Sequence, residues 1–325
     1  MRKHERNPRD HYAEITDQII AALEAGTPPW RQPWDNAKAG GPSMPQNAVT
    51  GARYRGINVL TLGMSPLAFM TSDPRWATYK QAQDRGWQIK KGSHGVTGFF
   101  YKRVELDRGD DDAHDAGGGG KWFPLLRSFT LFHVSQIEGV PAYTPPGIEE
   151  APWRAPESAE TIVRNSRADI RIGGERAFYS PATDHIQMPP QCAFRSAAAW
   201  SSVQLHELSH WSGSGTRLDR DLSGGFDSAN YAREELRAEI AQVMICAELG
   251  IPDCDFTNGA AYVAHWVSKL HDDKKEIFRA AAEAQRIADF LLAFHPDFAA
   301  RNGRDEAQSR TAVPTDEESD LKAAA

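Results

Sequence analysis

The feature that most constrains this chain is a segment with two histidines four residues apart. It runs from Ser196 to His210 and reads SAAAWSSVQLHELSH. An α-helix turns by about 100° per residue, so His206 and His210 project from one face and can bind the same ion. Glu207 follows His206, as in the HExxH motif, whose histidines bind zinc while the glutamate takes a proton from the metal-bound water. The segment therefore predicts a mononuclear zinc hydrolase site, typically one that acts on peptides.

The residues around the motif favour the helix that this chemistry needs. Ser196 is a suitable N-cap, and apolar side chains form a stripe along the segment at Ala199, Trp200, Val203 and Leu208. The alternative is that the two histidines are merely solvated on an exposed helix. The apolar stripe favours the metal site.

A catalytic zinc site needs a third protein ligand, which we expect from a later helix. The stretch 231–249, YAREELRAEIAQVMICAEL, has helical periodicity and carries Glu235 and Glu239 on one face. We predict that Glu235 binds the metal in a gluzincin-like set and that Glu239 accepts the second ring N–H of a histidine ligand. Zinc is the favoured ion, with manganese as an alternative. The other interpretation is that these carboxylates form only a solvated helix face.

The charge is distributed unevenly along the chain. The 325 residues have a formal net charge of −7, which alone disfavours nucleic acid as a partner. Residues 1–105, however, carry fifteen Lys and Arg against nine Asp and Glu, so the acidic surplus lies in the remainder. The length favours two domains, and the charge difference predicts different roles for them.

The cysteines and the apolar residues indicate the compartment. Three cysteines, Cys192, Cys246 and Cys254, lack CxxC spacing, which suits a reducing interior. The first residues lack the apolar core of a signal peptide, and no run approaches the roughly 18 apolar residues of a membrane helix. We therefore expect a cytoplasmic protein without membrane contact.

The first domain is predicted over residues 8–140 as a small sheet with helices. Its low-complexity stretch 107–121, DRGDDDAHDAGGGGK, should be a flexible insertion. The expected elements are a helix over 10–25, a loop over 27–47 with Trp30 and Trp34, a buried helix within 51–70, a helix over 74–86 that Asp73 caps, and strands over 87–90, 96–104 and 122–137.

A linker over 141–157, a mainly helical second domain over 158–298 and a disordered tail over 299–325 should follow. The overall class is α/β in the α+β sense. Its small sheet precedes the HExxH helix, as in zincin peptidases, and the strand 185–188 is expected at the sheet edge, where it can hold a peptide. The expected elements are a helix over 158–166, strands over 169–172, 177–179 and 185–188, the motif helix, the helix 231–249, and helices over 258–270 and 273–294.

Cations and flat rings alternate in the basic half, a pattern typical of single-stranded nucleic acid binding. Cations follow the phosphates while rings stack on bases without sequence readout. The predicted DNA-binding residues are Arg53, Tyr54, Arg55, Trp76, Tyr79, Lys80, Lys90 and Lys91. The alternative is that about half of these aromatic side chains pack in the core instead. Trp76 in particular is a candidate core residue. If the prediction holds, residues 8–140 alone bind single-stranded DNA in preference to duplex.

Several blocks of sequence resemble the ArdC family of antirestriction proteins, found on conjugative plasmids and related mobile elements. The resemblance covers most of residues 8–295. The blocks are PWRQPW at 29–34, YRGIN at 54–58, WATYKQA at 76–82, the turn KKGSHG, then HELSHWSG, YAREELRAEI and AAYVAHWVSKLHDDKKEIFRAAAEAQRIADF. The acidic insertion at 107–120 is longer than this pattern leads us to expect.

The resemblance implies a single-stranded-DNA-binding N-terminal domain, also found on TraC-type plasmid primases, joined to a zincin-like metallopeptidase domain. It implies protection of incoming DNA against host restriction, with a host restriction component as one conceivable protein substrate. It also implies that His206, His210 and Glu235 are metal ligands and that Glu207 is the general base. The remaining alternative is an intracellular metallopeptidase whose N-terminal domain recognises protein.

Overall fold

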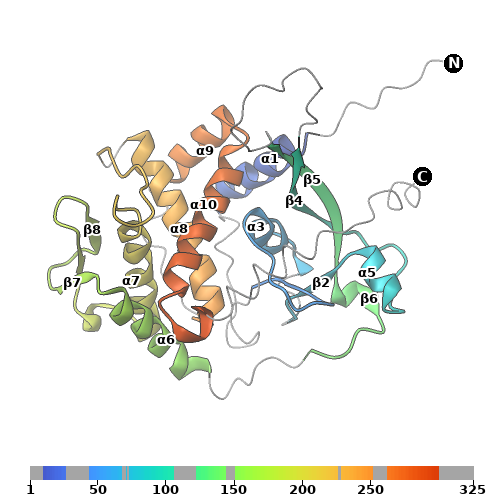
Figure 1. Cartoon of the computed structure of the whole chain (residues 1–325), viewed down its shortest axis with the longest axis horizontal. Helices are drawn as coiled ribbons and strands as arrows, with labels where there is room; N and C mark the ends of the chain where they lie inside the picture. Colours follow the sequence, from blue (N-terminus) through green and yellow to red (C-terminus); the bar gives the residue numbers. More distant parts are fainter. Residues whose placement is uncertain are drawn as a thin grey trace, which may run out of the picture.

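The structure, a computed structural model, has a helical side and a side built on a long β-hairpin (Figure 1). The predicted insertion, the tail beyond 299, Trp30 and Trp34 lie outside the described residues. The described residues are 10–26, 44–67, 71, 73–105, 122–143, 151–225, 228–251 and 262–299.

The N-terminal half begins with helix α1, His11–Glu24, as predicted. The Asp10 side chain caps it by accepting hydrogen bonds from the backbone N–H groups of Tyr12 and Ala13, both at 3.1 Å. Ile15, Ile19 and Leu23 recur at helical spacing and are buried. The apolar face of α1 therefore points into the protein.

A four-stranded sheet follows, in the order β1-β2-β5-β4. The long strands β4 and β5 are antiparallel, with Val96 opposite Leu131, and the buried helix α3 packs on β4. A separate pair joins β3 to β6. The bounds are β1 Gln46–Asn47, α3 Ile57–Gly63, β2 Arg75–Ala77, β3 Gln88–Ile89, β4 Val96–Glu105, β5 Trp122–His133, the 3₁₀ turn η1 Val134–Gln136 and β6 Ile137–Glu138.

The helix predicted over 74–86 is wrong in its first third. Residues 75–77 form the strand β2, and the helix α5 starts only at Tyr79 and ends at Asp84. Thr78 and Gln81 form a capping box, so the helix begins after Thr78 and not at Pro74. Trp76 thus lies opposite His133 in the sheet rather than on a helix face.

The C-terminal half contains a three-stranded sheet in the order β7-β9-β8. The prediction that residues 185–188 form the edge is wrong, because β9 pairs with β7 on one side and β8 on the other. Ile186 and Met188 are fully buried, as expected of a central strand. The bounds are β7 Asp169–Ile172, β8 Phe178–Ser180 and β9 His185–Met188.

Helices make up the rest of this half, and α8 packs between α7 and α10. The first of them, α6, already begins within the predicted linker. The bounds are α6 Ala151–Ser166, the 3₁₀ turn η2 Gln191–Ala193, α7 Ala197–Trp211, α8 Ala229–Leu249, α9 Val263–Asp272 and α10 Glu276–Leu292. None of the helices in the described ranges is both long and apolar enough to cross a membrane.

The two halves share a hydrophobic core at α1. One cluster of buried side chains includes Ile15 and Ile19 of α1 together with Leu236 and Ile240 of α8. Helix α1 lies against α9 (Figure 1). The hydroxyl of Thr16 in α1 donates a hydrogen bond of 2.7 Å to the backbone carbonyl oxygen of Lys274, which belongs to the C-terminal half. The buried core is therefore continuous between the two halves at α1, and the predicted domain boundaries stay a prediction.

Candidate metal centre

The two helices that form the candidate centre begin at capped residues. The Ser196 hydroxyl accepts the N–H of Ala199 at 3.0 Å, which confirms the predicted N-cap of α7. Ser228 caps α8 in the same way by accepting the N–H of Tyr231 at 3.1 Å. Both helices therefore begin at a side chain that satisfies a backbone N–H left free by the first helical turn.

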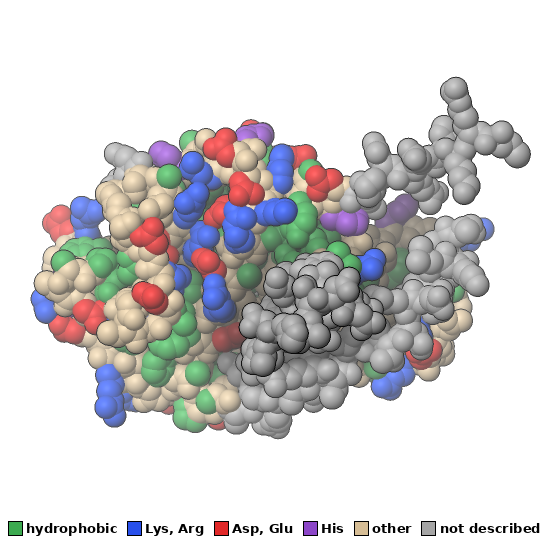
Figure 2. Space-filling model, turned by 45° about the horizontal axis from the view of Figure 1, so that its top comes forward, with side chains coloured by type: hydrophobic (Ala, Val, Ile, Leu, Met, Phe, Trp, Pro, Cys, Tyr) green, Lys and Arg blue, Asp and Glu red, His purple; other side chains and the backbone are tan. Residues whose placement is uncertain are grey.

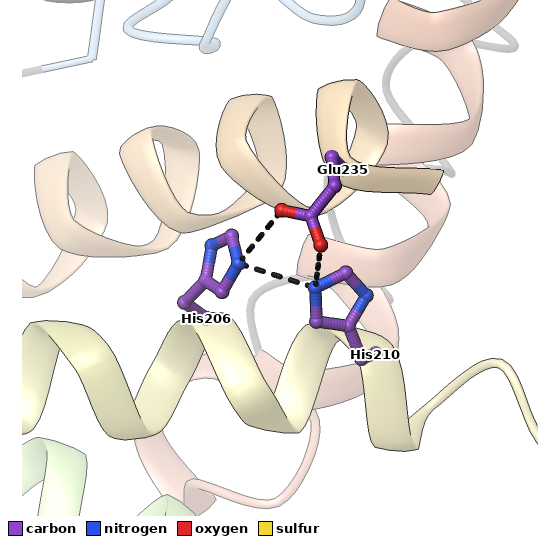
Figure 3. Close-up of side chains that lie close together, drawn as sticks. All are labelled: His206, His210 and Glu235. Carbon is purple, nitrogen blue, oxygen red and sulfur yellow. Dashed lines mark hydrogen bonds and ion pairs between the residues drawn. The ribbon is translucent and has the colours of Figure 1, made fainter. Parts of the chain in front are cut away.

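Side chains from α7 and α8 converge on one point (Figure 3). The Nε2 atoms of His206 and His210 are 3.1 Å apart. The Glu235 carboxylate lies 3.5 Å from His206 Nε2 and 3.4 Å from His210 Nε2. All three side chains are at most 14% exposed. The structure therefore brings together the three residues that the sequence selected as ligands.

This donor set fits a divalent cation. Neighbouring ligand atoms of a tetrahedral ion with bonds of about 2.0 Å are roughly 3.3 Å apart. The separations between these donor atoms, 3.1 to 3.5 Å, match that edge length. Two imidazole nitrogens and one carboxylate are also the ligand types of catalytic zinc sites, which leave one position for water.

Burial and neighbouring charges give the carboxylates at the site different pKa values. Burial raises the pKa of Glu207, which suits a group that accepts a proton. Burial also acts to raise the pKa of Glu235, but His210 and His206 outweigh it and hold this pKa well below its usual value. Glu235 therefore remains an anionic ligand, whereas Glu207 is a base with increased proton affinity.

The partner of the second nitrogen of His210 is Glu234, not the predicted Glu239. The Glu234 Oε1 atom lies 3.2 Å from His210 Nδ1. Glu239 is buried and lines the same cavity, so a role beside the other histidine stays a prediction. Successive helix residues differ by about 100°, so Glu234 points toward the end of α7 while Glu235 points at the metal position. The sequence offered no signal for this choice, because it depends on how the two helices cross.

The centre opens into a cavity of about 510 Å³. One wall is β8, one of the two edge strands of the small sheet, so the edge strand beside the centre is 178–180 rather than 185–188. The lining also includes four acids of α7 and α8, Glu207, Glu234, Glu235 and Glu239. Apolar and aromatic side chains in the wall are Phe178, Tyr179, Phe194, Val203, Tyr231 and Tyr262.

Two predicted DNA-binding arginines are engaged within the protein. Arg53 pairs with Glu248 at 2.9 Å, and Arg55 forms an ion pair with Asp289. Both acids belong to the C-terminal half, so these arginines join the halves. Tyr54 is half-buried between them, and its hydroxyl accepts a hydrogen bond from an asparagine amide. The sequence could not show these pairings because the partners are more than 190 residues away.

The other predicted DNA-binding residues divide into buried and exposed ones. Trp76 is 1% exposed and packs with Leu62 and Leu131, so the core alternative holds for this ring. Tyr79, in contrast, is 54% exposed. Lys90 and Lys91 are exposed, and the Lys90 ammonium donates to a backbone carbonyl at 2.8 Å. Lys80 follows Tyr79 on α5 and is half-buried.

Comparison with known proteins gives two family matches and several relatives. Residues 9–132 match the N-terminal domain of anti-restriction factor ArdC, and residues 157–283 match a zincin-like metallopeptidase family. Over 295 residues the chain is 42% identical to DNA primase TraC of Escherichia coli, covering 87% of this chain but 27% of the primase. It thus spans about a quarter of that relative. It is also 40% identical to the uncharacterized protein y4eC of Sinorhizobium fredii, covering 89% of this chain and 94% of that protein.

Solved structures extend the match to the fold. The metal-free antirestriction ArdC protein from plasmid R388 is 38% identical, with a TM-score of 0.71 over 89% of this chain and 99% of that one. The Mn(II)-bound structure of the same protein gives the same TM-score of 0.71. The mixed α/β architecture described above is therefore that of ArdC. Since two domain matches and a near full-length structural match agree, the chain belongs to the ArdC family of antirestriction proteins.

Proposed function

We propose that this protein binds single-stranded DNA and protects incoming plasmid DNA against host restriction, in the cytoplasm, with a zinc metallopeptidase as its C-terminal part. The observation that carries the peptidase proposal is the convergence of His206, His210 and Glu235 beside Glu207 at the floor of a cavity. Membership of the ArdC family supports the antirestriction role.

The chain's own residues supply each protein function that peptide hydrolysis needs. His206, His210 and Glu235 would hold the ion, which when bound acidifies a water molecule and polarises a carbonyl. Glu207 accepts the proton of that water and can return it to the leaving amine. The exposed edge of β8 can pair with the backbone of a peptide and hold it over the centre.

Zinc is the ion we propose, because two imidazoles and one carboxylate form a typical zinc set. Manganese remains the alternative, since one of the R388 ArdC structures is Mn(II)-bound. The peptide would come from a protein partner such as a host restriction component. The cavity does not indicate which peptide sequence the centre would prefer.

We place the DNA-binding surface on α5, with Tyr79 and Lys80, and on the turn after β3, with Lys90 and Lys91. These residues remain because Trp76 belongs to the core, Arg53 and Arg55 pair with acids of the C-terminal half, and the Tyr54 hydroxyl is hydrogen-bonded within the protein. Elsewhere, basic and acidic side chains are intermixed on the face drawn in Figure 2. Ion pairs such as that of Lys274 with Asp17 neutralise further basic side chains. Rings that stack on unpaired bases favour a single strand over duplex.

One alternative is an intracellular metallopeptidase whose N-terminal half recognises protein. It is favoured by Arg53 and Arg55, which form ion pairs within the protein instead of facing a DNA strand. Titration of labelled single-stranded and duplex oligonucleotides with the full-length protein separates the two proposals. Lys90→Ala with Lys91→Ala should lower the slope of log K against log salt by about 0.7 per lost phosphate contact. Arg171→Ala with Lys269→Ala, a charge-matched pair in the C-terminal half, should leave the slope unchanged. Absence of DNA binding would favour the protein-recognition alternative, whereas equal affinity for both DNA forms would remove the stacking argument and leave a nonspecific basic patch.

A further inference from the structure

Arg220 lies directly behind the candidate metal centre. It belongs to the loop between α7 and α8, and its side chain is 9% exposed. Its Nε donates to Glu234 Oε2 at 3.0 Å, and its Nη2 donates to Glu234 Oε1 at 2.6 Å. The same Oε1 faces His210 Nδ1 at 3.2 Å. A continuous chain of polar contacts therefore runs from Arg220 through Glu234 to a metal ligand.

We propose that Arg220 is a positioning residue for the metal centre and that it acts through Glu234 on His210. This inference rests on the metal centre proposed above. Two parallel charged hydrogen bonds fix the plane of the Glu234 carboxylate. The fixed carboxylate then accepts Nδ1–H of His210, which leaves the Nε2 lone pair directed at the ion. Without Arg220, Glu234 is free to turn, and the ring of His210 loses its fixed orientation.

The loop is shaped to hold this arginine in place. Its backbone N–H donates to the Gly213 carbonyl at 2.9 Å, and its side chain also donates to the Ser209 carbonyl at 2.6 Å and the Ser212 hydroxyl at 2.9 Å. Asp219, the preceding residue, has φ 49°, a left-handed conformation that Asp tolerates better than most residues. Together with the two bonds to Glu234, the two side-chain bonds to Ser209 and Ser212 satisfy four of the five N–H donors of the guanidinium group.

Gly213 provides the space that the guanidinium occupies. A Cβ atom at this position would lie 2.9 Å from Arg220 Nη2 and 3.0 Å from its Cζ. It would also lie 2.9 Å from a methyl group of Leu222. Any larger residue at 213 therefore displaces Arg220 or the loop. This explains the glycine of the HELSHWSG block by close approach rather than by backbone conformation.

Arg217 offers a matched control from the same loop. It also binds the end of α7, since its Nε donates to the Trp211 carbonyl at 2.6 Å and its guanidinium lies 4.0 Å from the Trp211 ring centroid. Its ion pair is with Asp184, on the side of the small sheet. Arg217 therefore contributes to loop packing, and its contacts with Trp211, Tyr179 and Asp184 do not lead to His210.

The test measures binding of zinc and of manganese to the metal-free full-length protein by calorimetry. Arg220→Met should weaken zinc binding about 10-fold or more, on the scale seen for partners of metal ligands. Arg220→Lys should fall between wild type and Arg220→Met, because an ammonium cannot make two parallel bonds. Gly213→Ala should weaken binding in the same direction. Arg217→Met should retain wild-type zinc affinity even where it lowers the melting temperature of the metal-free protein.

Absorption bands of the Co(II)-loaded protein report ligand geometry and give a second readout. They should change in Arg220→Met and remain as in wild type in Arg217→Met. Wild-type affinity and bands in Arg220→Met, or equal weakening in Arg217→Met, would overturn the inference. If Arg220→Met does not fold, Arg220→Lys and Gly213→Ala decide by the same criteria. Zinc binding that survives His210→Ala would instead overturn the proposed centre.

Discussion

The metal centre and the N-terminal basic surface are built in different ways. The centre takes His206, Glu207 and His210 from one helix and Glu235 from another, so helical spacing alone places three of the four on neighbouring positions. The residues predicted to bind DNA, in contrast, are distributed over a loop, a strand, a short helix and a turn, and the structure leaves only those of the helix and the turn for a DNA surface. A chemical pattern is therefore readable from sequence when one regular element holds it, and much less so when several elements share it.

Two histidines, His133 in the N-terminal half and His210 in the centre, differ in the direction of their pKa shifts. Burial lowers the pKa of His133, whose neighbours are the Asp73 carbonyl and the Ser135 hydroxyl. Burial also acts to lower the pKa of His210, but Glu235 and Glu234 outweigh it and raise this pKa well above its ordinary value. Burial acts in the same direction on both histidines, yet their pKa values shift in opposite directions, and the carboxylates mark the centre as a cation site.

The largest expected effect is on catalysis, and it separates the role of Glu207 as a base from the role of the metal ligands. Glu207→Gln should retain metal, since Glu207 is not a ligand, while an amide cannot accept the proton of the bound water. Loss of a general base should lower any peptidase rate by about 100-fold to 10,000-fold. A peptide-cleavage assay with metal analysis of the same sample checks both halves of this statement. Undiminished cleavage by the variant would rule out the zincin mechanism.

In the N-terminal half, Trp76→Ala should cost about 3–5 kcal/mol of folding free energy, the usual loss for a large buried ring. The reason is that Trp76 fills the core between Leu62 and Leu131. Denaturant unfolding of the full-length protein is the measurement. An unchanged unfolding midpoint would show that this ring does not belong to the core.

Tyr79→Ala is the complementary change at the exposed ring. It should weaken single-strand binding by about 1–3 kcal/mol, the contribution of one stacked base, with the salt slope almost unchanged. Unfolding should be nearly unaffected, because Tyr79 is more than half exposed. Oligonucleotide titrations at several salt concentrations test this, and unchanged affinity would remove Tyr79 from the proposed surface.

The smallest expected effect concerns pH. Since the folded-state pKa of His133 lies below its ordinary value of 6.5, its neutral form is favoured by folding. Its contribution to stability is present above about pH 6.5 and is lost as pH falls through the lowered folded pKa, by at most about 1.4 kcal/mol per pH unit. Unfolding of metal-free wild type and His133→Gln between pH 5 and 8 measures it. A wild-type curve no steeper than that of the variant would contradict the assignment.

Local patterns predicted several elements closely, and long-range contacts explain the failures. Strands 169–172 and 185–188 and the N-cap Ser196 agree with the structure because they depend on alternation and capping. The edge position of 185–188 and the helix over 74–77 were wrong. Each depends on a distant segment: β7 and β8 pair with β9 on both sides, and β5 pairs with β2. The contact of Glu234 with His210 was not predicted, because it depends on how α7 and α8 cross.

The most direct test of the account is the metal content of two variants on the same helix. Glu235→Ala should lower the zinc bound per chain by an order of magnitude or more after purification and dialysis, because a ligand of the ion is lost. Glu239→Ala, one turn further along α8, should keep most of the metal. Full zinc content in Glu235→Ala together with loss in Glu239→Ala would contradict the centre described here.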